Sequence, residues 1–313
     1  MKNFKEVVDM WIEDKQRFVK ESTMSVYNLQ VHTHLLPIFG ERETIVESEI
    51  QQFVLDRMNK GLSGKTVHDI LIVLKMIVRW ANKHGYWDCR SDWQILFPTK
   101  REQRDMEVMS LKDQQKLSRY LKENFSFKNL GLFICMYSGL RIGEVCGLKW
   151  SDFDPSSGTL TINRTVERIY IIDSGKRKSK VVVNTPKTAS SMRTIPLNRE
   201  ILKVMKKMYD VVNRSYYITS NSVDPLEPRT YRNHYHSVLK ALNIPKIKFH
   251  GLRHSFATRC VENQCDYKTV SVLLGHADVS TTLNLYVHPN MEHKKKCIDK
   301  IGKILGKKVT PNK

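Results

Sequence analysis

In this chain of 313 residues, six side chains could together attack a phosphodiester. They are Arg141, Lys187, His250, Arg253, His276 and Tyr286. A planar guanidinium can donate two parallel hydrogen bonds to the non-bridging oxygens of a phosphate. A tyrosine hydroxyl can serve as a covalent nucleophile, and histidine and lysine can carry the protons. Together these residue types indicate phosphoryl transfer through a tyrosine.

The spacing of these residues favours a common site. His250 and Arg253 are three residues apart, so on a helix they share a face and can reach one phosphate. Gly139 permits a sharp backbone turn that can aim Arg141 into a cleft, and Glu144 is placed to pair with or orient an arginine. His254 projects about a hundred degrees from Arg253 on a helix, which indicates a supporting or packing role.

Each of these residues also has an ordinary structural explanation when it is taken alone. Arg141 and Glu144 could form a surface ion pair on a helix, and a lone tyrosine on a helix is usually a packing residue. Lysines in loops are usually solvated, and Lys176, Lys178 and Lys180 are rivals of Lys187. A histidine pair four residues apart suits a zinc hydrolase, but Gly251 stands where the glutamate of that motif would follow the first histidine.

Helical periodicity dominates the first part of the chain. Apolar residues recur at three- and four-residue steps over residues 67–81, and Gly85 ends that helix. Three earlier helices are predicted over residues 3–18, from Ser22 or Thr23 to about 33, and over 46–60. The first part of the chain should therefore be helical.

The pattern changes to that of strands over residues 158–197. Alternating and β-branched residues, with a turn signal at 173–175, predict a small antiparallel sheet with Lys187 at a hairpin tip. Helices return over residues 199–212 and 229–241, and around His250. Ser280, Thr281 or Thr282 should cap a short helix that carries Tyr286. The predicted fold class is mostly α, with a small antiparallel sheet in a C-terminal domain.

The charge is divided unevenly along the chain. Residues 1–104 carry 16 Lys and Arg against 14 Asp and Glu, whereas residues 105–313 carry 36 against 18. A basic excess confined to the later part predicts a polyanionic partner there, and nucleic acid is the default candidate. The alternative is a generally basic protein with no such partner.

The six cysteines and the hydropathy restrict the class of protein further. The cysteines are scattered, with no CxxC pair and no signal peptide, so they should be reduced and mostly packing thiols in the cytoplasm. No apolar run reaches the roughly 18 residues of a membrane span, and no membrane partner is expected.

Three stretches together resemble the tyrosine recombinases of the phage-integrase and Xer type: residues 139–144, 250–254 and 273–288. The resemblance implies a two-domain DNA clamp. Residues 1–95 would be the core-binding, SAM-like domain, 96–108 a linker, and 109–313 the catalytic domain. A tail helix at 290–306 would dock on a neighbouring subunit.

The same resemblance implies an activity and roles for the residues. The enzyme would exchange DNA strands at specific sites through a 3′-phosphotyrosyl bond on Tyr286, for a phage or another mobile element. Arg141 and Arg253 would stabilise charge, His250 would accept or relay the tyrosine proton, and Lys187 would protonate the leaving 5′-oxygen. His276 would donate to the phosphate, with Glu144 and His254 in support.

The implied partners are double-stranded DNA, a homotetramer on two DNA sites, and an accessory DNA-bending or directionality protein. No cofactor or metal is expected, and the protein would act in the bacterial cytoplasm at the nucleoid. Two rival functions remain open. A type IB topoisomerase-like enzyme would use the same chemistry without synapsis of two sites, and a catalytically idle DNA-binding protein would form no covalent adduct.

Overall fold

The computed structural model describes residues 2–98, 107–173, 176–186 and 189–286, together with 295, 298–299 and 301–302. The chain divides into two compact units. The N-terminal unit comprises Met1–Asp105 and Glu167–Val182, and the C-terminal unit comprises Met106–Val166 and Val183–Lys313. Each unit has a hydrophobic core of its own.

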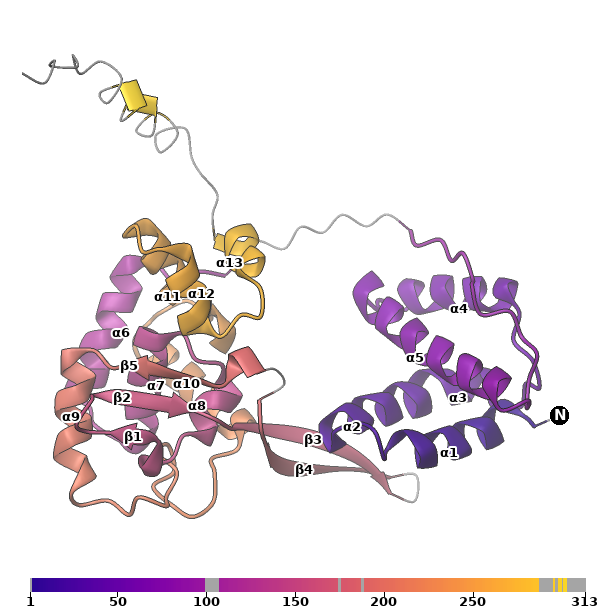
Figure 1. The fold of residues 1–313 in the computed structure, drawn as a ribbon, viewed down its shortest axis with the longest axis horizontal. Coiled ribbons are helices and arrows are strands. Elements are labelled where there is room, and N and C mark those ends of the chain that lie inside the picture. Colours follow the sequence, from indigo (N-terminus) through magenta and orange to yellow (C-terminus); the bar gives the residue numbers. More distant parts are fainter. Residues whose placement is uncertain are drawn as a thin grey trace, which may run out of the picture. The chain divides into compact units, whose positions relative to one another are not determined.

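Helices build most of the N-terminal unit (Figure 1). They are α1 (Phe4–Lys15), α2 (Glu21–Gln30), a π-helical turn (Val31–Leu35), α3 (Leu36–Phe39), α4 (Glu47–Asn59) and α5 (Gly64–Lys83). The four predicted helices are confirmed. The predicted cap of the second helix is wrong, because α2 starts one residue after Lys20, which makes no side-chain capping bond.

Helix α5 organises this unit because its apolar residues form one buried stripe. Val67, Ile70, Leu74 and Ile77 are all fully buried in the core. The Ser63 hydroxyl accepts the N–H of Thr66 at 3.1 Å and so caps the first turn. A helix with this pattern is stable only when its apolar face is covered, which the other helices of the unit provide.

A β-hairpin also contributes to the N-terminal unit. Strands β3 (Thr165–Asp173) and β4 (Lys176–Asn184) pair in a two-stranded sheet. The Tyr170 N–H donates to Ser25 Oγ at 2.9 Å, and Ser25 Oγ donates to the Tyr170 carbonyl at 2.7 Å. Lys180 pairs with Glu21 at 3.0 Å. The hairpin is thereby tied to helix α2.

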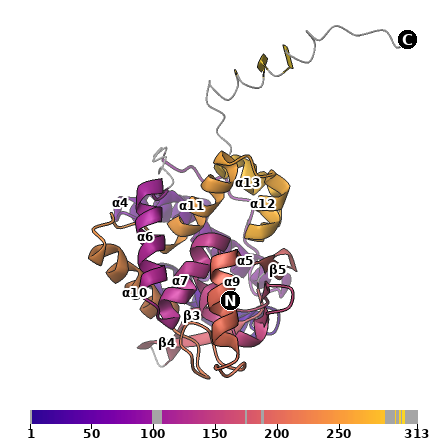
Figure 2. The ribbon, with the colours of Figure 1, turned by 90° about the vertical axis from the view of Figure 1, so that its left-hand side faces the viewer.

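The C-terminal unit combines helices with a second small sheet (Figures 1 and 2). Its helices are α6 (Leu111–Glu123), α7 (Phe127–Ser138), α8 (Ile142–Gly147), α9 (Arg199–Tyr209), α10 (Pro228–Ala241), α11 (Phe249–Glu262), α12 (Tyr267–Leu274) and α13 (Val279–Tyr286). Its strands are β1 (Phe153–Asp154), β2 (Thr159–Ile162) and β5 (Arg193–Pro196), in the order β1-β2-β5 with antiparallel pairing.

The predicted fold class, mostly α with small antiparallel sheets, is confirmed. The sequence predicts one sheet over residues 158–197, whereas the structure divides these strands between two sheets. The division arises because β3 and β4 extend as a separate hairpin that bonds to α2. Strand β4 therefore pairs with β3, and β5 pairs with β2.

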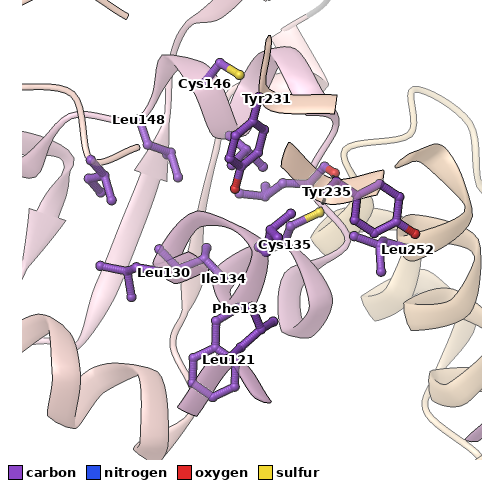
Figure 3. Packing of buried hydrophobic residues seen from close by; sticks show 14 of the residues in the cluster. Leu121, Leu130, Phe133, Ile134, Cys135, Cys146, Leu148, Tyr231, Tyr235 and Leu252 are labelled. Carbon is purple, nitrogen blue, oxygen red and sulfur yellow. Dashed lines mark hydrogen bonds between the residues drawn. The ribbon is translucent and has the colours of Figure 1, made fainter. Parts of the chain in front are cut away.

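Helix α7 is the central helix of the C-terminal unit. It is apolar on nearly every face and contacts α6, α8, α10 and α11. Cys135 from this helix packs among aliphatic and aromatic neighbours that include Tyr231 and Tyr235 of α10 (Figure 3). Gly139 ends helix α7, and the residues that follow begin the candidate site.

Packing agrees with the prediction for three of the described cysteines, since Cys89, Cys135 and Cys146 are buried. Cys260 is partly buried and Cys265 is exposed, and Cys297 lies outside the described residues. In the part of the chain that the structure describes, no helix is long and apolar enough to cross a bilayer.

Candidate active site

The first side of the site is the turn between α7 and α8. Gly139 ends α7 with φ +63°, a left-handed conformation that glycine adopts without strain. A Cβ at this position would lie 2.6 Å from Phe256 and 2.7 Å from Leu274, so the turn also needs glycine for space. The turn leads to Arg141, which immediately precedes α8. The predicted sharp turn at Gly139 is confirmed.

Glu144 holds Arg141 in place. Its carboxylate accepts the Arg141 backbone N–H at 2.9 Å and Arg141 Nη1 at 2.8 Å. Arg141 Nη2 also donates to the Gly275 carbonyl at 3.4 Å. Burial alone would raise the pKa of Glu144, but hydrogen bonds and charge from Arg193 and Arg141 outweigh it and hold that pKa below its usual value. Glu144 is therefore an ionised anchor for two arginines.

Helix α11 supplies the second arginine. Arg253 is buried, with 1% of its side chain exposed, and its Nη1 donates to the Gly139 carbonyl at 2.9 Å. That bond ties α11 to the turn that positions Arg141. The two predicted phosphate ligands therefore lie at the same turn, although 112 residues separate them in the sequence.

The histidines of α11 lie beside these arginines. His250 and His254 contact each other edge to face, with ring centroids 4.6 Å apart. Partial burial, with the charges of His254, Arg253 and Arg141, lowers the pKa of His250 to about 4. Burial and Arg253 lower the pKa of His254 as well. Both rings are therefore neutral at neutral pH, and a neutral imidazole can accept a proton.

His276 enters the site from the end of α12. Gly275 ends that helix with φ +67°, and the His276 N–H donates to the Ser271 carbonyl at 3.0 Å. These bonds form a helix-terminating motif that turns the chain sharply. Partial burial and the charges of Arg253 and Arg141 lower the pKa of His276 to about 4, so this ring is also neutral.

Thr282 connects His276 to the helix of the predicted nucleophile. The Thr282 hydroxyl is fully buried and lies 2.8 Å from His276 Nδ1. Thr282 belongs to α13, which packs on α12 and ends at Tyr286. The side chain of Tyr286 lies outside the described part of the structure. Tyr286 follows Thr282 by four residues, so the two share a helix face.

The predicted cap of this helix is wrong. Ser280, Thr281 and Thr282 lie inside α13, which begins at Val279. Asp278 is the capping residue, because its carboxylate accepts the Ser280 N–H at 2.9 Å. Asp278 is as good a capping residue as serine, and it stands one position before the helix. Thr282 is consequently free for its contact with His276.

The predicted general acid, Lys187, lies outside the described residues. The segment that contains it runs from β4 to β5, strands of different sheets. The zinc alternative gains no support from the geometry. Among the residues that the structure describes, no group of three or more His, Cys, Asp or Glu could hold a metal ion.

Two residues of the site were missed by the sequence reasoning: Arg193 and Thr282. Arg193 on β5 is 5% exposed and bonds to both oxygens of Glu144, at 3.0 and 3.2 Å. The alternation along β5 could have indicated it, since Arg193 shares a face with the buried Ile195. No sequence signal distinguishes Thr282 from its neighbours Ser280 and Thr281.

The arrangement provides two guanidinium groups and the neutral imidazoles of His250 and His276. Arg141 comes from the turn between α7 and α8, Arg253 and His250 come from α11, and His276 follows the end of α12. Guanidinium groups fixed by carboxylate and carbonyl acceptors can stabilise the negative charge of a phosphate, including the charge that develops during a reaction. Neutral histidines next to them can take up or relay a proton. The geometry therefore favours chemistry on a phosphodiester.

Comparisons with known proteins agree with this geometry. Residues 107–293 match the phage integrase family, and residues 3–56 match the N-terminal SAM-like domain of phage integrases. A tyrosine recombinase XerC-like protein of Caldanaerobacter subterraneus subsp. tengcongensis is 28% identical over 287 residues, which span 85% of this chain and 73% of that protein. The ICEBs1 integrase of Bacillus subtilis is 23% identical over 289 residues, 88% of this chain and 76% of that protein.

Solved structures share the fold. The Tn1549 transposon integrase in complex with circular intermediate DNA matches with a TM-score of 0.75 and 19% identity, over 96% of this chain and 100% of that chain. A lambda integrase tetramer bound to a Holliday junction matches with a TM-score of 0.64 and 18% identity, over 91% of this chain and 78% of that chain.

Proposed function

Since this chain belongs to the phage integrase family of tyrosine recombinases, we propose that its active site consists of Arg141, His250, Arg253, His276 and the nucleophile Tyr286. As a member of that family it is a site-specific DNA recombinase, an enzyme that cuts and rejoins DNA for a mobile element. The observation that supports the site most is the convergence of Arg141, Arg253 and His276 next to helix α13, which ends at Tyr286.

The chemical step is an attack by Tyr286 on a backbone phosphorus. A bond forms between the tyrosine oxygen and phosphorus, and the bond from phosphorus to the 5′-oxygen breaks. The products are a 3′-phosphotyrosyl link and a free 5′-hydroxyl, which later attacks the partner duplex. His250 accepts the tyrosine proton, and Lys187 donates a proton to the leaving 5′-oxygen. The covalent link conserves the energy of the broken bond, so strand rejoining needs no nucleoside triphosphate.

The arginines stabilise the negative charge that grows on the non-bridging oxygens. Donors fixed in advance contribute most to such a step, because they need not reorient as the charge develops. Arg141 is fixed by Glu144 and by the Gly275 carbonyl, and Arg253 by the Gly139 carbonyl. The guanidinium groups of Arg141 and Arg253 are the proposed phosphate donors.

His276 is the proposed third donor to the phosphate. A neutral imidazole carries one N–H, so donation from Nε2 requires Nδ1 to be unprotonated. The Thr282 hydroxyl, 2.8 Å from Nδ1, would then donate to that nitrogen and select the required tautomer. His254 contacts His250 and would hold its ring in position.

DNA binding should depend strongly on salt. The later part of the chain, from residue 105, carries 36 basic against 18 acidic residues, and neutralised phosphates release counterions on binding. We further propose that residues 1–95 bind the opposite face of the duplex from the catalytic domain at 109–313, with 96–108 as linker. The protein would act on DNA at the bacterial nucleoid.

Strand exchange between two duplexes requires several active sites. We propose a homotetramer on two DNA sites, with the tail helix at 290–306 docking on a neighbouring subunit and an accessory protein bending the DNA. The lambda integrase tetramer on a Holliday junction supports this assembly by its similar fold. A type IB topoisomerase-like activity would show the same cleavage without synapsis of two sites.

Trapping the covalent complex tests the function. A duplex nicked close to the cleavage position loses a short 5′-hydroxyl fragment after cleavage, which prevents rejoining. The protein is incubated with a library of such duplexes that carry element-end sequences. The covalent protein–DNA complexes are then isolated and digested, and the attached DNA and peptide are sequenced. The expected result is one DNA sequence attached through its 3′ end to the peptide that contains Tyr286. Random DNA sequences at the adduct would favour the relaxing enzyme, and no adduct would leave only a DNA-binding protein.

A further inference from the structure

Arg193 is a buried charge in the C-terminal unit, and the proposed mechanism does not use it. It lies at the start of strand β5, and 5% of its side chain is exposed. Its Nη2 and Nη1 bond to the two oxygens of Glu144 at 3.0 and 3.2 Å. Its Nε donates to the Leu273 carbonyl at 2.7 Å, and Nη1 also donates to the Ser191 carbonyl at 3.0 Å.

One branch of this network leads to Arg141. Arg193 fixes the plane of the Glu144 carboxylate by bonding to both of its oxygens. The same two oxygens accept Arg141 Nη1 at 2.8 Å and the Arg141 backbone N–H at 2.9 Å. A rotation of the carboxylate would move the Arg141 guanidinium, so the geometry of one arginine depends on the other.

A second branch leads to His276. The Leu273 carbonyl that accepts Arg193 Nε lies three residues before His276, in the last turn of α12. A Cβ on Gly275 would lie 2.8 Å from Arg193 Nη1, so the guanidinium packs directly under the turn that directs His276. Arg141 Nη2 donates to the carbonyl of the same glycine. Arg193 thus contacts both segments that present phosphate ligands.

Stability alone does not account for such a pair. Removing two charges from water costs about as much as their attraction returns, and apolar pairs of similar volume usually fold as well or better. A buried ion pair is best explained where it fixes a geometry that apolar side chains would leave loose. The Arg193–Glu144 pair lies at the point where two catalytic segments must be held together.

We propose that Arg193 is a positioning residue for DNA cleavage, which acts through Glu144 and the Leu273 carbonyl to hold Arg141 and His276 at one phosphate. The inference rests on the proposed roles of Arg141 and His276. Arg193 itself does not touch the DNA in this account.

Arg193→Lys tests the proposal because it retains the charge beside Glu144 but loses the planar fork. A lysine cannot serve both Glu144 oxygens and the Leu273 carbonyl together. Arg164→Lys is the matched control, since Arg164 also makes a two-pronged pair, with Asp152 at 2.8 and 2.8 Å. Melting temperatures and DNA affinity are measured for both variants, followed by single-turnover cleavage at saturating protein.

The expected result is unchanged DNA affinity for both variants and a selective loss of cleavage rate in Arg193→Lys. A misplacement of reacting groups by a fraction of an ångström to 1 Å costs on the order of tenfold to a hundredfold in rate. The substrate is then changed to one with a neutral methylphosphonate at the cleavage position. Less charge then develops on the non-bridging position, so the defect of Arg193→Lys relative to wild type should shrink to about threefold or less.

The outcomes separate this inference from the proposed function. Failure of the wild-type protein to form a covalent adduct would remove the proposed function. An adduct in the wild type, with Arg193→Lys cleaving as fast as Arg164→Lys, would overturn only the role of Arg193. A defect of equal size on both substrates would make Arg193 merely structural. If Arg193→Lys does not fold, Arg193→Met combined with Glu144→Gln removes both buried charges and undergoes the same comparison.

Discussion

Replacing Thr282 by valine should impair cleavage by disturbing His276 alone. Valine keeps the shape of threonine but substitutes a methyl group for the hydroxyl. That hydroxyl is fully buried and 2.8 Å from His276 Nδ1. Without it, Nδ1 can take the single proton of the neutral ring, and Nε2 then loses its N–H. The donor proposed for the phosphate is lost in that tautomer.

The size of the effect follows from one hydrogen bond. A buried hydrogen bond of this kind contributes about 0.5 to 1.5 kcal/mol net. Since about 1.4 kcal/mol corresponds to a tenfold change in rate, Thr282→Val should slow cleavage by roughly two- to twelvefold. The pKa of His276, lowered to about 4 by burial and by Arg253 and Arg141, keeps the ring neutral throughout the assay.

Single-turnover cleavage of a nicked substrate, at pH 7.5 and saturating protein, measures this effect. Thr282→Ser is the matched control, because it retains the hydroxyl and should cleave within about twofold of wild type. DNA affinity and melting temperature are measured in parallel to exclude a loss of folding. Equal rates for Thr282→Val and Thr282→Ser would refute the assignment of the tautomer to Thr282.

Three further results are expected. Lys187→Ala should cleave ordinary DNA roughly a hundredfold slower than wild type. It should cleave DNA with a bridging 5′-sulfur at nearly the wild-type rate, because a thiolate leaves without a proton. An equal defect on both substrates would assign the role of general acid to another residue. Cleavage should survive exhaustive chelation with EDTA, because Arg141 and Arg253 supply the positive charge; loss of cleavage that added magnesium or zinc restores would contradict this. In the DNA-free protein, NMR titration should find His250 and His276 neutral at pH 5.5, since burial and the nearby arginines lower the pKa of each to about 4. Because these histidines bind protons at a higher pH in the unfolded chain than in the folded protein, they should make the folded state less stable as the pH falls from 6.5 towards 4. Ring signals that titrate near pH 6.5 would refute the lowered pKa values.

The sequence was informative wherever local rules decide the structure. The apolar stripe of α5 and the need for glycine at position 139 follow from periodicity and from backbone conformation. His250 and Arg253 could be placed on one face of a helix, and Tyr286 on a short helix, for the same reason. Resemblance to a family then supplied the roles, which spacing alone left open.

The sequence was uninformative where distant segments decide the structure. Alternation along β5 places Arg193 on the same face as the buried Ile195. Only its contacts with Glu144 and Leu273, which come from two other segments, explain how a charged residue is buried there. The hairpin of β3 and β4 forms its own sheet and bonds to α2 through Ser25 and Tyr170, which are 145 residues apart, so local patterns could not predict it. The cap of α13 was misplaced because four residues close together, Asp278, Ser280, Thr281 and Thr282, offer side-chain capping oxygens.

The central claim is that Tyr286 forms a covalent bond with DNA, and one variant tests it directly. Tyr286→Phe removes a single oxygen, so the variant should bind target DNA with the affinity of the wild type. On a denaturing gel, wild-type protein incubated with the nicked substrate should give a slowly migrating protein–DNA adduct. The same gel should show none for Tyr286→Phe. An adduct of undiminished amount in the variant would contradict the claim and assign the nucleophile to another residue.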